Sequence, residues 1–82
     1  MTTVQKISNF EDILNECNNL SSAWTALGIA NKTGKSEHSV NEALDYAEDQ
    51  GWVVPTHGTY LSYTISAKGR QEFTKKFGQC RV

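Results

Sequence analysis

The sequence predicts a small α+β domain in which three helices precede a β-hairpin and a short last helix. Two observations support this prediction. Apolar residues recur at helical spacing as far as Gly51, and beyond it they alternate with polar residues. The length of 82 residues suits one hydrophobic core, so residues 1–82 are expected to form a single domain.

The first helix is expected around a stripe of apolar residues with one buried face. Ser8, with Glu11 three residues later, has the spacing of a capping box and is expected to begin this helix. The helix is expected to run for about ten residues. The apolar stripe consists of Phe10, Ile13, Leu14, Cys17 and Leu20.

A short second helix is expected to follow, with Ser21 or Ser22 as its N-cap. Gly34 is expected to end it, because glycine adopts the left-handed conformation at low cost. Its expected apolar face consists of Trp24, Leu27, Ile29 and Ala30.

The third helix has the clearest pattern in the chain. Ser36 or Ser39 is expected to cap it, Glu42 would complete a capping box from Ser39, and Gly51 is expected to close it. Its apolar residues follow the i, i+3, i+4, i+7 spacing of one buried helix face. They are Val40, Ala43, Leu44 and Ala47.

A β-hairpin is expected after the third helix. Residues 52–54 form its first strand, residues 55–58 its turn, and residues 60–65 an alternating second strand. Ser66 is expected to cap the last helix, which would end at Gly78. Phe73 and Phe77 lie one turn apart on this helix, and Trp24 and Trp52 are expected in the core.

The charges are distributed unevenly along the chain. The net charge is −1, but residues 1–66 carry three basic and eight acidic residues, whereas residues 67–82 carry five basic and one acidic residue. No apolar run approaches the roughly 20 residues that cross a membrane, and the N-terminal ten residues lack a secretory signal pattern. A cytoplasmic protein without a membrane segment is expected.

Catalytic and metal-binding patterns are missing from the sequence. Cys17 and Cys80 lie far apart and lack the paired spacing of a zinc site, so both are expected to be free thiols. The chain has no glycine-rich phosphate loop and no spacing of a nucleophile with a base. We therefore expect neither an enzyme nor a cofactor or metal, and we expect His38 and His57 to be exposed polar residues.

Two segments resemble the winged-helix DNA-binding proteins, in particular the small regulators of bacteria and phages. Residues 29–53 resemble their helix-turn-helix, and residues 63–73 resemble the strand and helix that close the wing. The matching residues of the first segment are Ile29, Ala30, Thr33, Gly34, Ser36, Val40, Leu44, Gly51, Trp52 and Val53. The resemblance implies a winged helix-turn-helix fold, in which a three-helix core precedes a hairpin wing and a short C-terminal helix.

The resemblance places three functional units along the chain. The helix-turn-helix would span about residues 22–50, the wing about residues 52–65 and the C-terminal helix about residues 67–77. The turn between the second and third helices is short, so these helices are expected to cross steeply.

The function implied by the resemblance is transcription regulation through duplex DNA, read by the third helix and the wing. The implied contacts in the helix-turn-helix are Lys32, Thr33, Lys35, Ser36, His38, Ser39 and Asn41. Those in the wing are Thr56, His57, Thr59 and Tyr60. Since one such module buries little surface on DNA, a homodimer is expected, with Phe73 and Phe77 as candidates for its contact.

A second interpretation stays open, because the exposed face of the third helix is acidic. Its carboxylates are Glu37, Glu42, Asp45, Glu48 and Asp49. They would repel phosphates and attract a basic protein, such as one that itself binds nucleic acid. The alternative function is therefore a protein-interaction module of the same fold.

Overall fold

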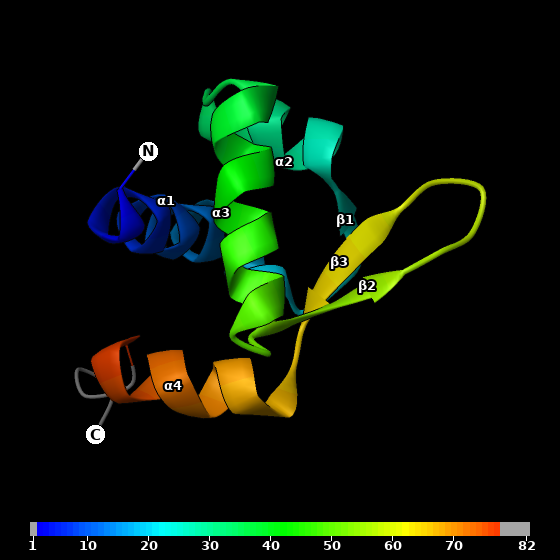
Figure 1. Cartoon of the computed structure of the whole chain (residues 1–82). Helices are drawn as coiled ribbons and strands as arrows, with labels where there is room; N and C mark the ends of the chain where they lie inside the picture. Colours follow the sequence, from blue (N-terminus) through cyan, green and yellow to red (C-terminus); the bar gives the residue numbers. More distant parts are fainter. Residues whose placement is uncertain (1, 78–82) are drawn as a thin grey trace.

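The computed structural model describes the backbone of residues 2–77 and the side chains of residues 2–73. Its elements, in chain order, are α1 (Thr3–Glu16), the 3-10 turn η1 (Asn18–Leu20), β1 (Trp24–Thr25), α2 (Ala26–Thr33), α3 (Glu37–Asp49), β2 (Val53–Thr56), β3 (Ser62–Ile65) and α4 (Ala67–Phe77) (Figure 1). The predicted α+β class and the order of three helices, hairpin and last helix are confirmed for this part of the chain. The arrangement is compatible with a winged-helix-like layout.

The three strands form one antiparallel sheet in the order β1-β3-β2. Tyr63 in the central strand lies opposite Trp24 of β1 on one side and Pro55 of β2 on the other. In Figure 1 the hairpin of β2 and β3 projects away from the helices, and α1 passes behind α3. The sheet therefore joins the start of α2 to the half of β3 that lies next to the hairpin loop.

The core lies where α1, α2, α3, the base of the hairpin and α4 meet. The four residues that the sequence assigned to the buried face of α3 are all buried, as are the five residues of the α1 stripe. Trp52 lies in an aromatic cluster, with its ring centroid 5.7 Å from that of Phe10 and 4.8 Å from that of Phe73. Trp52 is thus a core residue as predicted, and Trp24 is half-buried against the core.

The start of α1 differs from the prediction. Thr2 Oγ1 accepts a hydrogen bond from Gln5 N at 3.2 Å, and Gln5 Oε1 accepts one from Thr2 N at 3.1 Å. The capping box is therefore Thr2 with Gln5, and the predicted box of Ser8 with Glu11 is wrong. Both pairs have the required spacing, and the polar first turns continue the helix because no glycine or proline interrupts them.

The start of α2 also differs. Thr25 Oγ1 accepts a hydrogen bond from Gly28 N at 3.1 Å, so Thr25 is the N-cap, and the prediction of Ser21 or Ser22 is wrong. Trp24 is extended because it pairs with Tyr63 in the sheet, and this tertiary contact overrides its helical spacing.

The ends of α3 follow the sequence closely. Ser36 Oγ accepts a hydrogen bond from Ser39 N at 3.2 Å, which confirms Ser36 as the N-cap and excludes a start at Ser39. Gly34 and Gly51 have φ values of 76° and 79°, where glycine avoids steric strain. Residues 34–36 alone separate α2 from α3, which confirms the short turn.

The hairpin is shifted relative to the prediction. Strand β2 begins at Val53 and includes Pro55 and Thr56, although we expected the turn to begin at Pro55. Proline is tolerated there because β2 is at the edge of the sheet. Strand β3 begins at Ser62, so the predicted strand residue Tyr60 lies in the loop.

Helix α4 begins as predicted and packs on the core. Ser66 Oγ accepts a hydrogen bond from Gly69 N at 3.0 Å and donates one to Gly51 O. Phe73 was a candidate for a dimer contact only if the core left its ring free. The ring is only 5% exposed and packs in the core, so that condition is not met. The side chain of Phe77 and the predicted helix end at Gly78 lie outside the described residues.

Candidate functional site

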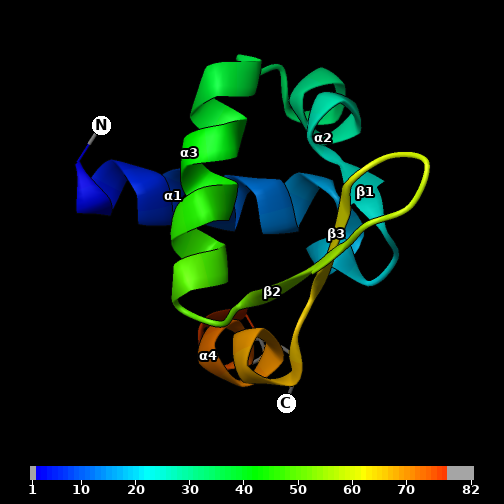
Figure 2. The same ribbon diagram turned by 45° about the vertical axis from the view of Figure 1, so that its right-hand side comes forward.

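The surface formed by α3 and the hairpin holds most of the residues that the sequence marked as candidates. Both elements stand forward of α1 in Figure 2, with α2 and β1 beside the loop of the hairpin. The turn of residues 34–36 fixes the start of α3, and the sheet fixes the base of the hairpin. The side chains on this surface therefore sit on elements held by the core.

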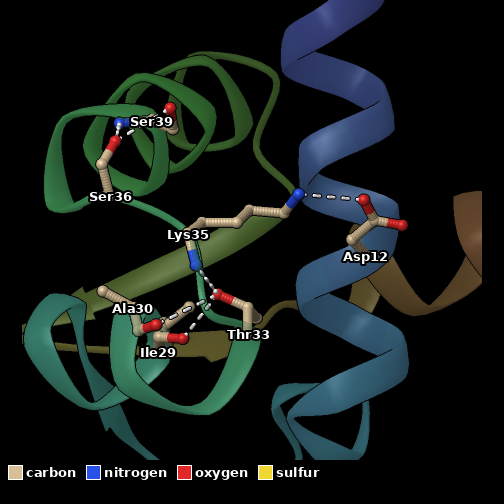
Figure 3. A network of polar contacts seen from close by, with 7 residues as sticks. All are labelled: Asp12, Ile29, Ala30, Thr33, Lys35, Ser36 and Ser39. Carbon is tan, nitrogen blue, oxygen red and sulfur yellow. Dashed lines mark hydrogen bonds and ion pairs between the residues drawn. The ribbon is translucent and has the colours of Figure 1, made fainter.

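The turn between α2 and α3 uses two of the candidate residues for its own structure. Thr33 Oγ1 donates a hydrogen bond to Ile29 O at 2.8 Å and accepts one from Lys35 N at 3.3 Å. Lys35 Nζ lies 3.1 Å from Asp12 Oδ2 of α1 (Figure 3). Lys35 thus ties the turn to α1, and its charge is offset by a carboxylate.

The first turn of α3 presents two exposed candidates. His38 and Asn41 are exposed, whereas Ser39 is half-buried. Ser36 is exposed, but its hydroxyl caps the helix and donates to Ser39 Oγ at 3.1 Å. The polar side chains with the most room to meet a ligand here are therefore His38 and Asn41.

The predicted wing residues all lie on the surface of the hairpin. Thr56, His57, Thr59 and Tyr60 are exposed. Between Val53 and Ile65 the sequence has no lysine, arginine, aspartate or glutamate. The hairpin is therefore close to neutral and offers phosphates no lysine or arginine.

The carboxylates of α3 lie on the surface, and two of them act on the hairpin. Four of the five are exposed, and Glu42 is half-buried. Burial raises the pKa of the Tyr63 phenol, and the nearby charges of Glu48 and Asp45 raise that pKa further. Both carboxylates are exposed, and Tyr63 belongs to the central strand β3. No lysine or arginine occurs within α3 to offset them.

On the side where α3 borders α1, the lining residues are polar and include no carboxylate. A polar hollow, open to solvent, lies between the two helices and is lined by Gln5, Ser8, Asn9, His38 and Ser39. Further along, Lys6 Nζ lies 6.0 Å from the centroid of the Tyr46 ring. The sequence analysis missed the α1 residues of this hollow, because their approach to α3 is a tertiary contact.

Sulfur and metal chemistry have little support in the described residues. Cys17 is fully buried, and this burial is the main reason why the pKa of its thiol is raised. A raised pKa keeps the thiol protonated and unreactive. Within the described side chains, no group of three histidine, cysteine, aspartate or glutamate residues is placed to hold a metal ion.

No protein-family model matches this chain, and no curated protein matches it significantly. Among the described residues, no helix has the length and apolar character needed to cross a membrane.

Proposed function

We propose that this chain is a winged-helix protein whose third helix and wing bind a basic segment of a partner protein. Three features support the winged-helix part of the proposal: the short turn before α3, the antiparallel sheet that includes a strand before α2, and the projecting hairpin. In this interpretation α3 is the recognition helix and the hairpin of β2 and β3 is the wing.

The observation that carries the proposal is the acidic face of α3. We call the exposed residues Glu37, Asp45, Glu48 and Asp49 the acidic face. Duplex DNA carries one negative charge for about every 1.7 Å of its axis, so DNA placed along this face meets repulsion over most of the helix. A lysine- or arginine-rich segment in the same place is attracted, and its association is accelerated.

The positive charges near this face do little to cancel it. Lys35 is partly buried and paired with Asp12, and Lys6 lies against Tyr46 near α1. Lys32 is exposed at the end of α2, outside α3 itself. Lys68 of α4 lies beside Gly51, just past the end of α3, and offsets part of the charge near that end. The four carboxylates of the acidic face still outnumber the exposed Lys32 and Lys68, so the face keeps a net negative charge over a screening length of about 8 Å at physiological salt.

Duplex DNA is the second candidate partner, favoured by the exposure of the first turn of α3. Asn41 has the chemistry to pair with an adenine edge, and His38 can donate to guanine. Lys32 and the exposed wing residues would contact the backbone. This binding would place the DNA beside Glu37 at the start of the helix, and the repulsion would grow toward Asp45, Glu48 and Asp49.

Neutralising part of the acidic face tests the two candidates against each other. The first variant combines Asp45→Asn with Glu48→Gln. A matched control combines Glu16→Gln with Glu72→Gln, which removes the same charge from exposed positions on α1 and α4. Binding of a labelled oligolysine peptide and of a labelled DNA duplex is measured for each by fluorescence anisotropy at about 50 mM salt.

The proposal predicts that the first variant binds the peptide about tenfold more weakly than the wild type, while the control changes it far less. Equal losses in both variants would show that only net charge matters and would contradict a specific surface. Strong binding of the duplex by the wild type, tightened in the first variant, would support the DNA candidate instead.

A further inference from the structure

Three large apolar side chains lie exposed near the free end of the hairpin. Leu27 is 55% exposed, Tyr60 75% and Leu61 42%. We call these three residues the tip patch. Leu27 follows Thr25 of β1 by two positions, and Leu61 directly precedes Ser62 of β3. Because Thr25 pairs with Ser62, the sheet brings both leucines to the same end.

The sequence pattern alone gives a different expectation for these residues. Leu27 was predicted in the buried face of the second helix, and Leu61 on the same strand face as the buried Tyr63. Leu27 is exposed because α2 starts only at Ala26, which turns its side chain away from the core. Single exposed apolar residues are common, but a group of them often marks an interaction surface.

The surroundings of the tip patch indicate the chemistry of its partner. The hairpin carries no lysine, arginine, aspartate or glutamate, so an apolar group meets no side chain of these four types there. Helix α3 packs against β2, and β2 pairs with β3, whose first residue Ser62 directly follows Leu61. The apolar tip patch and the helix that carries the carboxylates thus border the same sheet.

Building on the proposed function, we propose that the tip patch anchors an aliphatic or aromatic side chain of the same basic segment that α3 binds. The occupant is a peptide in which lysines or arginines alternate with apolar residues, since charge complementarity holds it on α3. A purely polybasic segment lacks the second contact.

Two labelled peptides of about 12 residues test this inference. One alternates lysine with serine, and the other has the same charge with two serines replaced by leucine. Wild-type protein is expected to bind the leucine peptide about tenfold more tightly in fluorescence anisotropy. The variant Tyr60→Ser with Leu61→Ser is expected to bind both peptides equally, at the level of the serine peptide.

The control is Val4→Ser, which removes an apolar side chain that is also 75% exposed but lies on α1. It should keep the preference for the leucine peptide, and losing that preference would overturn the inference. Circular dichroism is used to check that both variants fold, which we expect because the substituted positions are exposed.

The outcomes separate this inference from the proposed function. If the wild type binds the two peptides equally and the Asp45→Asn and Glu48→Gln variant binds them more weakly, the role of the tip patch is refuted but the proposed function is not. No binding of either peptide overturns both proposals. Retained preference in the Tyr60→Ser and Leu61→Ser variant would also refute the tip patch as the anchor.

Discussion

Replacing Gly69 with alanine is expected to destabilise the fold, because α4 packs closely against the main chain of Trp52, the residue just before β2. A Cβ atom at Gly69 would lie 2.2 Å from Trp52 O and 2.9 Å from Ile65 Cγ1. The oxygen belongs to the main chain and also accepts a hydrogen bond from Ser66 N at 2.9 Å. Since it cannot turn aside, α4 must move by about 1 Å to restore ordinary contact.

The size of the effect follows from what α4 buries. Overpacking of this kind costs about 1–3 kcal/mol. Moving α4 also disturbs the contacts of Phe73 with Phe10 and Trp52, whose ring centroids are 5.3 Å and 4.8 Å from it, each worth about 0.5–1.5 kcal/mol. Alanine returns up to about 1 kcal/mol through its helix propensity. The net loss in free energy of unfolding is therefore about 2–3 kcal/mol.

Urea denaturation followed by tryptophan fluorescence measures this loss. In a domain of this size the same change lowers Tm by roughly 10–20 °C. Gly58→Ala is the matched control, since nothing lies within 4 Å of its Cβ position, and it should change stability by less than about 0.5 kcal/mol. A Gly69→Ala protein as stable as the wild type would refute the close packing of α4 on Trp52.

Four further predictions test other contacts. Glu48→Gln should lower the pKa of Tyr63 toward its ordinary value of 10.0, which carbon NMR of labelled tyrosine measures. An unchanged pKa would show that the charge of Glu48 does not act on Tyr63. Because burial and nearby carboxylates favour the neutral phenol, its contribution to stability should be complete below pH 10.0 and lost as pH rises above it. Cys17 should react with a thiol reagent only as fast as the protein unfolds, and rapid reaction of that thiol in the native state would contradict its burial. Thr25→Ala should lower the free energy of unfolding, measured by urea denaturation, by about 1 kcal/mol, because it removes the acceptor for Gly28 N. Thr25→Ser keeps that acceptor and should lose much less stability. Equal losses in the two variants would contradict the role of the cap.

The helices that the sequence predicted well are those whose signals are local. The apolar spacing of α3, the cap at Ser36 and the glycines at positions 34 and 51 specify the helix and its ends without help from distant residues. Where two local signals competed, as with Thr2 and Ser8 for the start of α1, the sequence offered no means to choose between them.

The features that the sequence did not predict depend on tertiary contacts. Strand β1 has only two residues and exists because it pairs with β3. The same pairing delays the start of α2 and exposes Leu27. Lys35 is a basic residue at a position expected to contact phosphate, and only the fold shows that its Nζ lies 3.1 Å from Asp12 Oδ2. The acidic face of α3 was therefore predicted from the sequence, whereas the pairing that offsets the charge of Lys35 was not.

An NMR titration of labelled protein tests the central claim, which is that the acidic face of α3 binds a basic protein segment. The protein is titrated separately with the leucine-containing lysine peptide and with a short duplex at about 50 mM salt. The account predicts that the peptide shifts the amides of Asp45, Glu48 and Tyr60, and that the duplex leaves them unchanged. Shifts caused by the duplex at His38, Asn41 and the hairpin, with none from the peptide, would contradict the account.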